Sequence, residues 1–365
     1  MAVKKKIVVV AMSGGVDSSL TAALLKDEGY EVIGVTMQIW PSDDPDKELD
    51  QGGCCSLSAV DDARRVADTL GIPFYVMNFR ELFEQKVIDL FVSEYLAGRT
   101  PNPCIACNRY IKFEAFLDKA RGLEADYIAT GHYARISYNQ ARGRWAIGMA
   151  EDDRKDQTYV LYNMSQEQLS RTLMPLGEYT KDEVRRMAAS YDLKVANKPE
   201  SQEICFVTDN DYHRFMREKA GRQISPGPFL DVRGNYLGQH QGLAYYTVGQ
   251  RKGLGITFGE PMYVVALDPT RNAVILGRNN EVFNKALVAG DNNFILYESL
   301  DAPLTVKAKI RYSARPAEAV IIPEGEGRVR VNFTEPQRAI TPGQAVVYYE
   351  GNYVVGGGTI EKTLE

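Results

Sequence analysis

The first feature of the sequence that could do chemistry is a glycine-rich turn, Ser-Gly-Gly-Val-Asp-Ser-Ser, at residues 13–19. Glycines let the backbone turn tightly and bring several N–H groups to face one point, and a helix that begins there adds partial positive charge. A turn of this kind binds phosphate or pyrophosphate. It lacks the Lys-Ser/Thr ending of a Walker loop and the GxGxxG pattern of a dinucleotide fold. The alternative is a plain glycine-rich connection between a strand and a helix.

The second feature is a set of cysteines, five in the whole chain. An odd number does not indicate a disulfide framework, which leaves catalysis, redox chemistry or metal binding. Cys104 and Cys107 lie in a proline-rich segment at residues 100–108, at the start of a predicted helix that runs to about residue 121, and Arg109 and Lys112 follow. A helix N-terminus and nearby cations favour a nucleophilic thiolate. The other cysteines are Cys205, in the segment SQEICF at 201–206, and the adjacent Cys54 and Cys55, which we interpret as partly buried or loop thiols.

The elements that must position these residues alternate between strand and helix over the first half of the chain. The pattern predicts strands at 6–11, 31–39, 74–78 and 126–130, and helices at 16–27, 58–70 and 80–96, with Ser58 as the N-cap of the second helix. Such alternation indicates a parallel sheet with helices on both faces, an α/β domain.

Ligands of such sheets bind beyond the carboxyl ends of the strands. Two further strand ends therefore matter. Met37 lies near the end of the second strand, where it packs on an adenine or fills a gap in the core. Gly131 and His132 follow the strand at 126–130, and His132 either contacts a substrate or has a structural role.

After about residue 206 the pattern changes to glycine-dense segments and then to short strands separated by Gly, Pro and Asn turns, as in a small β-barrel. We therefore predict three domains: a catalytic domain at 1–208 that carries the glycine-rich turn, a small central domain at 209–277 and a C-terminal β-barrel at 278–365.

One predicted strand of the barrel, residues 304–312, alternates between apolar and basic side chains. It would present Lys307, Lys309 and Arg311 opposite a core face that ends in Tyr312. Residues 305–338 hold seven Lys and Arg against four Glu. This basic stripe suits a nucleic-acid backbone, and the alternative is a solvated face of the barrel.

The bulk composition sets limits on the class of protein. The chain has 365 residues and a formal net charge of -5, and a local basic face is compatible with that acidic total. No apolar run is long enough for a membrane-spanning helix. The short apolar stretch after the N-terminal lysines leads into the glycine-rich turn, so we expect no secretory signal, no membrane partner and a cytoplasmic location.

Three motifs in this order closely resemble the tRNA-specific 2-thiouridylases of the PP-loop ATP pyrophosphatase superfamily: the SGGVDS turn, the NPxxxCN loop with its following IKF, and the SQEICF segment. The resemblance covers essentially the whole chain. It implies an enzyme that uses ATP and Mg²⁺ to adenylate the C2 carbonyl of the wobble uridine, position 34 of tRNA. Sulfur then replaces the oxygen, giving 2-thiouridine, AMP and pyrophosphate.

The resemblance also implies roles for particular residues. Cys107 would be the nucleophile and Cys205 the carrier of a persulfide, loaded by a cysteine desulfurase or a sulfur relay protein, and a Cys107–Cys205 disulfide would remain after transfer. Asp17 would help to bind magnesium. The ATP-binding residues would be Ala11, Met12, Ser13, Gly14, Gly15, Val16, Asp17, Ser18, Met37 and Gly131. The residues at the target base and the rest of the tRNA would be Asn102, Pro103, Cys104, His132, Lys155, Asp156, Gln157, Arg311, Tyr312 and Gln344.

The chain departs from many members of that family at Cys104, where they carry Asp. Cys104, Cys107 and Cys205 are three thiolates that could converge on a [4Fe-4S] cluster with one open iron. We favour the persulfide route and leave the cluster as its alternative. A zinc site that joins Cys54 and Cys55 to Cys104 and Cys107 would have unusual spacing.

Three other functions are compatible with parts of the sequence. PP-loop synthetases that adenylate a carbonyl for attack by ammonia share the first motif, but they need neither the Cys107 and Cys205 pair nor a basic barrel. A non-catalytic tRNA-binding protein would not need intact Ser13, Asp17 and Ser18. A thiol oxidoreductase built on Cys104 and Cys107 would need a thioredoxin-like context, which is absent.

Overall fold

The computed structural model describes residues 5–39, 57–197, 204–207, 209, 211–256 and 259–364. Cys54 and Cys55, and any zinc site that includes them, lie outside the described residues. The chain divides into two compact units. The first comprises residues 1–87, 104–210 and 352–354, and the second comprises 88–103, 211–351 and 355–365.

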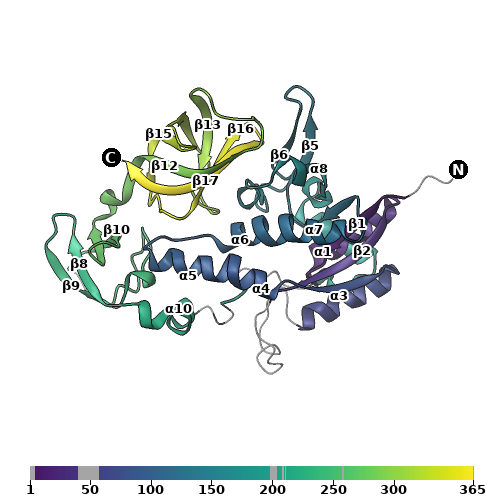
Figure 1. The fold of residues 1–365 in the computed structure, drawn as a ribbon, viewed down its shortest axis with the longest axis horizontal. Helices are drawn as coiled ribbons and strands as arrows, with labels where there is room; N and C mark the ends of the chain where they lie inside the picture. The colour runs from purple at the N-terminus through teal and green to yellow at the C-terminus, as the bar shows by residue number, and fades with distance from the viewer. Residues whose placement is uncertain are drawn as a thin grey trace. The chain divides into compact units, whose positions relative to one another are not determined.

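A five-stranded parallel sheet in the order β3-β2-β1-β4-β7 forms the centre of the first unit (Figure 1). Its strands are β1 (Ile7–Ala11), β2 (Glu31–Gln38), β3 (Phe74–Asn78), β4 (Tyr127–Ala129) and β7 (Thr172–Leu173). The predicted parallel sheet is confirmed. Strand β7 was not predicted, because two residues are too few to show a period.

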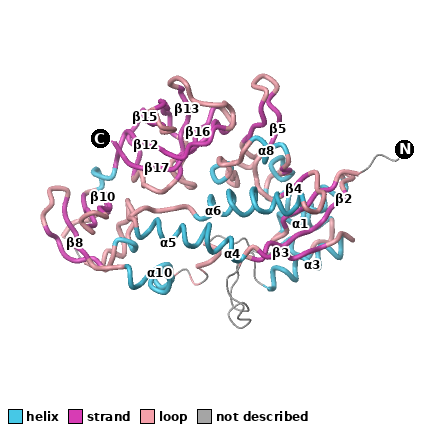
Figure 2. The backbone as a smooth tube through the Cα atoms, viewed as in Figure 1, coloured by secondary structure: helices cyan, strands magenta, loops and turns pink. Residues whose placement is uncertain are grey.

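Apolar side chains on both faces of β1 hold this sheet in the core. Val8 and Val10 point to one face and share a core with helices α1 (Val16–Asp27), α3 (Leu57–Leu70) and α9 (Lys181–Ser190). Val9 points to the other face and is fully buried as well. Figure 2 shows the strands of this sheet in magenta with α1 and α3 beside them. The sheet therefore has no solvated face at β1, as its continuous run of β-branched residues predicted.

The first unit contains further elements outside this sheet. They are α4 (Arg80–Phe83), η1 (Glu84–Ile88), α6 (Pro103–Ala106), η2 (Cys107–Ala115), α7 (Phe116–Arg121), β5 (Arg135–Asn139), β6 (Arg144–Gly148), η3 (Thr158–Val160), α8 (Gln166–Ser170), η4 (Pro175–Glu178) and η5 (Lys194–Asn197).

Three helices differ from the prediction. Ser58 lies inside α3, which includes Leu57, and is therefore not its N-cap. The helix predicted at 80–96 contains the π-helical segment η1 between α4 and α5 (Asp89–Leu96). The cysteine helix begins at Pro103, and its middle, η2, is also π-helical. Wide turns of this kind often occur at functional sites, and they have no signature in the hydrophobic pattern.

The second unit contains a closed six-stranded barrel in the order β12-β15-β14-β13-β16-β17, which closes by pairing of β12 with β17 (Figure 1). The barrel strands are β12 (Phe283–Phe294), β13 (Leu304–Lys309), β14 (Ala317–Pro323), β15 (Val329–Arg338), β16 (Ala345–Glu350) and β17 (Tyr353–Leu364). The predicted C-terminal β-barrel is confirmed. A second sheet has the order β10-β11-β8-β9. Its strands are β8 (Gly227–Asp231), β9 (Tyr236–His240), β10 (Tyr263–Asp268) and β11 (Ala273–Gly277), and the remaining elements are α10 (Tyr212–Ala220), η6 (Gly221–Gln223), η7 (Leu243–Tyr245) and η8 (Asn279–Val282).

Aromatic contacts explain why residues 88–103 belong to the second unit. Phe91 and Tyr95 of α5 pack against Tyr212 of α10, with ring centroids 6.0 and 4.8 Å apart. Phe91 also meets Phe215 at 6.2 Å. The segment that leads to the cysteine helix is therefore held by the second unit.

The basic strand of the barrel is shorter than predicted. Residues 304–310 alternate as expected, with Val306, Ala308 and Ile310 buried. Strand β13 ends at Lys309, however, and Tyr312, predicted on the core face, is 45% exposed. The chain turns after the strand, so the period of two no longer determines which side a residue faces.

Candidate active site

The glycine-rich turn lies between β1 and α1 and has the backbone geometry that it requires. Gly14 has a φ of +68°, and a Cβ there would lie 2.2 Å from the carbonyl oxygen of Ala59, so no other residue fits. Gly15 is the N-cap of α1. The Ser18 hydroxyl accepts a hydrogen bond from the Ser13 backbone N–H at 3.1 Å and donates to the Gly15 carbonyl at 3.2 Å. These bonds fix the turn around the N-terminus of a twelve-residue helix.

A cavity of about 190 Å³ opens beside this turn. The ends of β1, β2 and β4 contribute to its wall, together with the first turn of α1 and the cysteine helix. Its lining residues are Ala11, Met12, Ser13, Asp17, Ser18, Thr36, Met37, Lys112, Thr130, Gly131, His132 and Gln157. The structure thus brings together seven of the ten residues expected at ATP with His132 and Gln157, which were expected at the tRNA. Gly14, Gly15 and Val16 form the turn without lining the cavity.

Gly131 is required by close packing of two backbones. A Cβ at this position would lie 2.8 Å from both the carbonyl carbon of Asp17 and the backbone nitrogen of Ser18. The end of β4 therefore approaches the first turn of α1 directly, and this contact gives the cavity its shape.

The carboxylate of Asp17 has two partners at the edge of the cavity. Lys181 Nζ donates to both carboxylate oxygens, at 2.7 and 2.8 Å, and the Tyr133 hydroxyl donates to Oδ1 at 2.7 Å. The Lys181 side chain is 7% exposed and that of Asp17 is 30% exposed. Sequence reasoning missed Lys181. The Thr180 to Glu183 capping box marks the start of its helix, but no sequence signal connects that helix to a residue 164 positions away.

The imidazole of His132 lies between a hydroxyl and an ammonium group. Its Nδ1 is 2.8 Å from Thr130 Oγ1, and its Nε2 is 3.5 Å from Lys112 Nζ. Burial lowers the pKa of His132 well below its usual value of 6.5, and the charge of Lys112 lowers it further. The ring is therefore neutral at physiological pH.

The three described cysteines lie on two segments of the first unit. Cys104 is exposed, in α6, and Cys107 is half-buried at the first position of η2. Cys205 is half-buried, and its neighbour Phe206 packs edge-on against Phe83 with centroids 6.0 Å apart. Within the described ranges, no group of three or more His, Cys, Asp or Glu side chains is arranged to hold a metal ion. Cys104, Cys107 and Cys205 are thus not arranged as such a group in the described part of the chain.

Residues expected at the tRNA are found in both units. In the first unit, Lys155 is half-buried, whereas Asp156 is buried and accepts hydrogen bonds from Ala150 N at 3.1 Å and Thr158 Oγ1 at 2.6 Å. Gln157 Oε1 accepts the backbone N–H of Tyr133 at 2.8 Å. Asp156 and Gln157 thus have structural bonds beside the cavity.

In the second unit, Asn102 and Pro103 are half-buried. Arg311 donates to the carbonyls of Arg338 and Ala339 at 2.9 and 2.5 Å. Gln344 Nε2 donates to the carbonyls of Thr100 and Pro101 at 2.9 and 3.3 Å. The Lys309 ammonium lies 5.4 Å from the centre of the Tyr312 ring.

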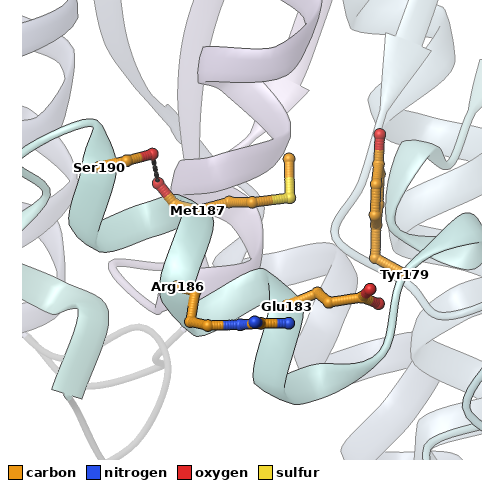
Figure 3. A pocket seen from close by; sticks show the side chains of 5 residues that line it. All are labelled: Tyr179, Glu183, Arg186, Met187 and Ser190. Atoms are coloured by element: carbon orange, nitrogen blue, oxygen red, sulfur yellow. Dashed lines mark hydrogen bonds between the residues drawn. The ribbon is translucent and has the colours of Figure 1, made fainter.

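A second hollow, of about 370 Å³, lies along α9 and contains none of the predicted residues (Figure 3). Its lining residues are Tyr179, Glu183, Arg186, Met187 and Ser190. Met187 points toward the Tyr179 ring in Figure 3. No helix in the described part of the chain is long and apolar enough to cross a membrane.

Comparison with known proteins matches the chain to three family descriptions in succession. Residues 6–209 match the "tRNA methyl transferase HUP domain", 213–278 the "tRNA methyl transferase PRC-barrel domain" and 284–360 the "Aminomethyltransferase beta-barrel domain".

Relatives of similar length match over nearly the whole chain. The tRNA-specific 2-thiouridylase MnmA of Pelotomaculum thermopropionicum is 60% identical over 99% of this chain and 98% of its own length. Proteins of the same name are 58% identical in Desulforamulus reducens, over 100% of this chain and 99% of theirs, and 59% identical in Carboxydothermus hydrogenoformans, over 99% of both. The chain therefore belongs to the tRNA-specific 2-thiouridylases, a family of sulfur-transferring enzymes.

Proposed function

We propose that this protein thiolates the wobble uridine of tRNA at C2, in an ATP-dependent reaction that ends with sulfur transfer from a cysteine persulfide. One observation carries the proposal beyond family membership. The helix that carries Cys104 and Cys107 also supplies Lys112 to the wall of the cavity beside the glycine-rich turn. A nucleophile on that helix lies near a site suited to activated phosphate chemistry.

The residues of the cavity fit ATP. The backbone N–H groups of the glycine-rich turn and the N-terminus of α1 would hold the departing pyrophosphate. Thr36 and Met37, at the end of β2, would contact the adenosine. Magnesium accompanies ATP and neutralises phosphate charge, with few protein ligands of its own. Asp17 is the carboxylate of the turn, and its ion pair with Lys181 means that a metal would have to compete for the same oxygens.

The first chemical step activates a poor leaving group. The C2 oxygen of uridine forms a bond to the α-phosphorus, the bond from that phosphorus to the bridging oxygen breaks, and pyrophosphate leaves with the electron pair. The N3 proton of the uridine is released. The former carbonyl oxygen now leaves readily, as part of AMP.

The second step moves sulfur and balances as a two-electron exchange. The outer sulfur of a Cys205 persulfide attacks C2, and AMP departs with the former C2 oxygen. The Cys107 thiolate then attacks the inner sulfur, releasing 2-thiouridine and leaving a Cys107–Cys205 disulfide. Alternatively, Cys107 attacks first and releases hydrosulfide for the attack on C2. Either way the outer sulfur is reduced and the two cysteines are oxidised, so a thiol reductant and a sulfur-donor protein are needed for the next turnover.

The barrel and the segment before Cys104 are the proposed tRNA surface. Lys307, Lys309 and Arg311 suit phosphate contacts, and Asn102 and Pro103 would flank the target base, which proteins read most readily when it is unstacked in a loop. We assign the protein to the cytoplasm, where tRNA is modified.

The test is incubation of the enzyme with unmodified tRNA, MgATP and a cysteine desulfurase with its substrate, followed by nucleoside mass spectrometry. Wild type should form 2-thiouridine at the wobble position. Cys205→Ser should still release pyrophosphate on addition of tRNA but form no 2-thiouridine. Cys107→Ser should also release pyrophosphate and accumulate tRNA linked to Cys205 through a disulfide.

Cys104→Asp is the matched variant for the source of sulfur. The persulfide route predicts that it keeps thiolation, because Cys104 takes no part in either sulfur step. The measurement includes iron, acid-labile sulfide and absorbance near 400 nm of anaerobically purified protein. A stoichiometric cluster that is lost together with thiolation in Cys104→Asp would replace the persulfide route.

A further inference from the structure

The sequence placed Lys112 near Cys107 as a cation that favours the thiolate, but neither its sequence context nor the resemblance assigns it to the cavity beside the glycine-rich turn. It lies in η2, one π-helical hydrogen-bonded turn after Cys107, and its side chain lines the cavity. Its backbone therefore belongs to the cysteine helix, and its charged side chain lies at the wall of the proposed nucleotide site.

The contact with His132 determines how this ammonium is held. A lysine ammonium has only donors, so His132 Nε2, at 3.5 Å, must be the acceptor nitrogen of a neutral ring. His132 Nδ1 then carries the proton and donates to Thr130 Oγ1 at 2.8 Å. The Phe113 ring, 5.7 Å from the imidazole between centroids, covers the ring from the same helix that carries Lys112. These contacts hold the Lys112 ammonium beside the residues that follow β4.

The strand order defines which side of the nucleotide faces Lys112. β1 lies between β2 and β4, so the turn after β1 occupies the middle of the cavity. Thr36 and Met37 follow on the β2 side, where the adenosine would lie, and Thr130, Gly131 and His132 on the β4 side. Lys112 is on the β4 side, away from Met37. A triphosphate that enters from β2 across the turn would bring its phosphates toward Lys112.

We propose that Lys112 is a catalytic residue for adenylation, contacting the α-phosphate of ATP, and that His132 is the residue that positions it. The inference rests on the proposed function and goes beyond it, because it names the protein group that stabilises the transferred phosphate. As the uridine oxygen bonds to the α-phosphorus and the bond to pyrophosphate breaks, the Lys112 ammonium would stabilise negative charge on the non-bridging oxygens. A fixed charge aimed at the position where negative charge develops stabilises such a transition state more than it stabilises bound ATP.

The experiment separates binding from chemistry with Lys112→Gln. ATP affinity of the free enzyme is measured by calorimetry, and pyrophosphate release is measured in a single turnover with tRNA. The rate of release should fall by about 100-fold or more, whereas ATP affinity falls by less than about tenfold. Lys112→Arg should recover part of the rate. Lys119→Gln, an exposed lysine of α7 that contacts the Phe79 ring, is the matched control and should stay within about twofold of wild type.

A second pair of variants tests the positioning role of His132. His132→Asn should slow pyrophosphate release less than Lys112→Gln does, and the double variant should be no slower than Lys112→Gln alone. A His132 that merely supports the fold would give additive losses. Circular dichroism checks folding, and Lys112→Met, which keeps the apolar stem, replaces the Gln variant if the latter unfolds.

The possible outcomes separate a failure of this inference from a failure of the proposed function. If wild type releases no pyrophosphate with tRNA, the proposed function itself fails. If wild type does so and Lys112→Gln stays within about threefold of its rate, Lys112 has no catalytic role and the proposed function stands. Equal losses in affinity and rate would make Lys112 a residue for ATP binding only, which also overturns its catalytic assignment.

Discussion

Lys181 Nζ lies 2.7 and 2.8 Å from the two carboxylate oxygens of Asp17, so the aspartate of the glycine-rich turn is part of an ion pair within the protein. The Tyr133 hydroxyl also donates a hydrogen bond to Asp17. The backbone N–H of Lys181 donates to the carboxylate of Asp152 at 3.3 Å. Residues of α1, the segment after β4 and α9 thus meet at one carboxylate. The glycine-rich turn is thus held by a helix that begins 164 positions after Asp17.

Removal of the lysine should destabilise the protein and weaken ATP binding together. Lys181→Met leaves the Asp17 carboxylate without its buried counter-ion. We expect a loss of about 2 kcal/mol in the free energy of unfolding, less than for a fully buried pair because Asp17 is 30% exposed. Urea unfolding measures this loss. Arg185→Met, on the exposed side of the same helix, is the control, and equal effects of the two variants would contradict the assigned pair.

A methyl group at Gly131 should narrow the cavity beside the glycine-rich turn without unfolding the chain. Its Cβ would lie 2.8 Å from backbone atoms of Asp17 and Ser18, which cannot move aside as a flexible side chain would. Gly131→Ala should weaken ATP binding by about tenfold or more, as measured by calorimetry. Gly221→Ala, whose Cβ meets nothing within 4 Å, should leave the affinity unchanged. Wild-type affinity in Gly131→Ala would show that this approach does not shape the site.

Gln344 should act on the segment before Cys104 even without tRNA. Its amide donates to the carbonyls of Thr100 and Pro101, and Thr100 N donates to Pro342 O at 2.9 Å. Gln344→Ala should therefore increase proteolysis or amide exchange at residues 99–103 in the free enzyme. Gln337→Ala is the control, since that side chain bonds within its own strand. If exchange is unchanged in Gln344→Ala and only tRNA affinity falls, the residue is a tRNA contact alone.

Charge reversal on the barrel should weaken tRNA binding but not ATP binding. Lys309 is the better position to test, because Arg311 holds two backbone carbonyls and its loss would also disturb the barrel. Lys309→Glu should raise the Kd for tRNA and lower the salt dependence of log Kd by about 1. Lys285→Glu, exposed on β12, controls for net charge. Equal tRNA affinities of the two variants would remove β13 from the proposed RNA surface.

Stability should fall below neutral pH through His132. Burial, and then Lys112, lower the pKa of this histidine in the folded state, whereas the unfolded chain takes up a proton near its usual value of 6.5. The contribution of His132 to stability is present above that value and is lost as the pH falls toward the folded-state pKa. Between about pH 7 and about pH 5.5, wild type should lose about 1 kcal/mol more than His132→Asn in urea unfolding. The pKa of His240 is also lowered by burial, and its effect cancels because both proteins contain it. Parallel losses would mean that His132 is charged in the folded protein.

Much of the first unit depends on conformational preferences of neighbouring residues, so the sequence alone predicts it. The β-branched run of β1 specifies a strand buried on both faces, and Gly14 and Gly15 specify the turn into α1, because these preferences act over neighbouring residues. The bounds of α1 and β3 agree with the prediction for that reason. The three short motifs also identified the family, because their residues and their order along the chain can be recognised without any distance in the folded protein.

Only the tertiary structure decided which residues surround the glycine-rich turn. Lys181 meets Asp17 through the packing of α9 on α1, and Lys112 lines the cavity from the π-helical segment η2. Neither the register of distant helices nor a widened turn leaves a periodic signal. Tyr312 turned outward because a strand ended three residues early, and strand length depends on what pairs beside it. Local steric preferences depend on neighbouring residues and can therefore be predicted from the sequence. The contacts that complete this site form between segments that meet only after the chain has folded.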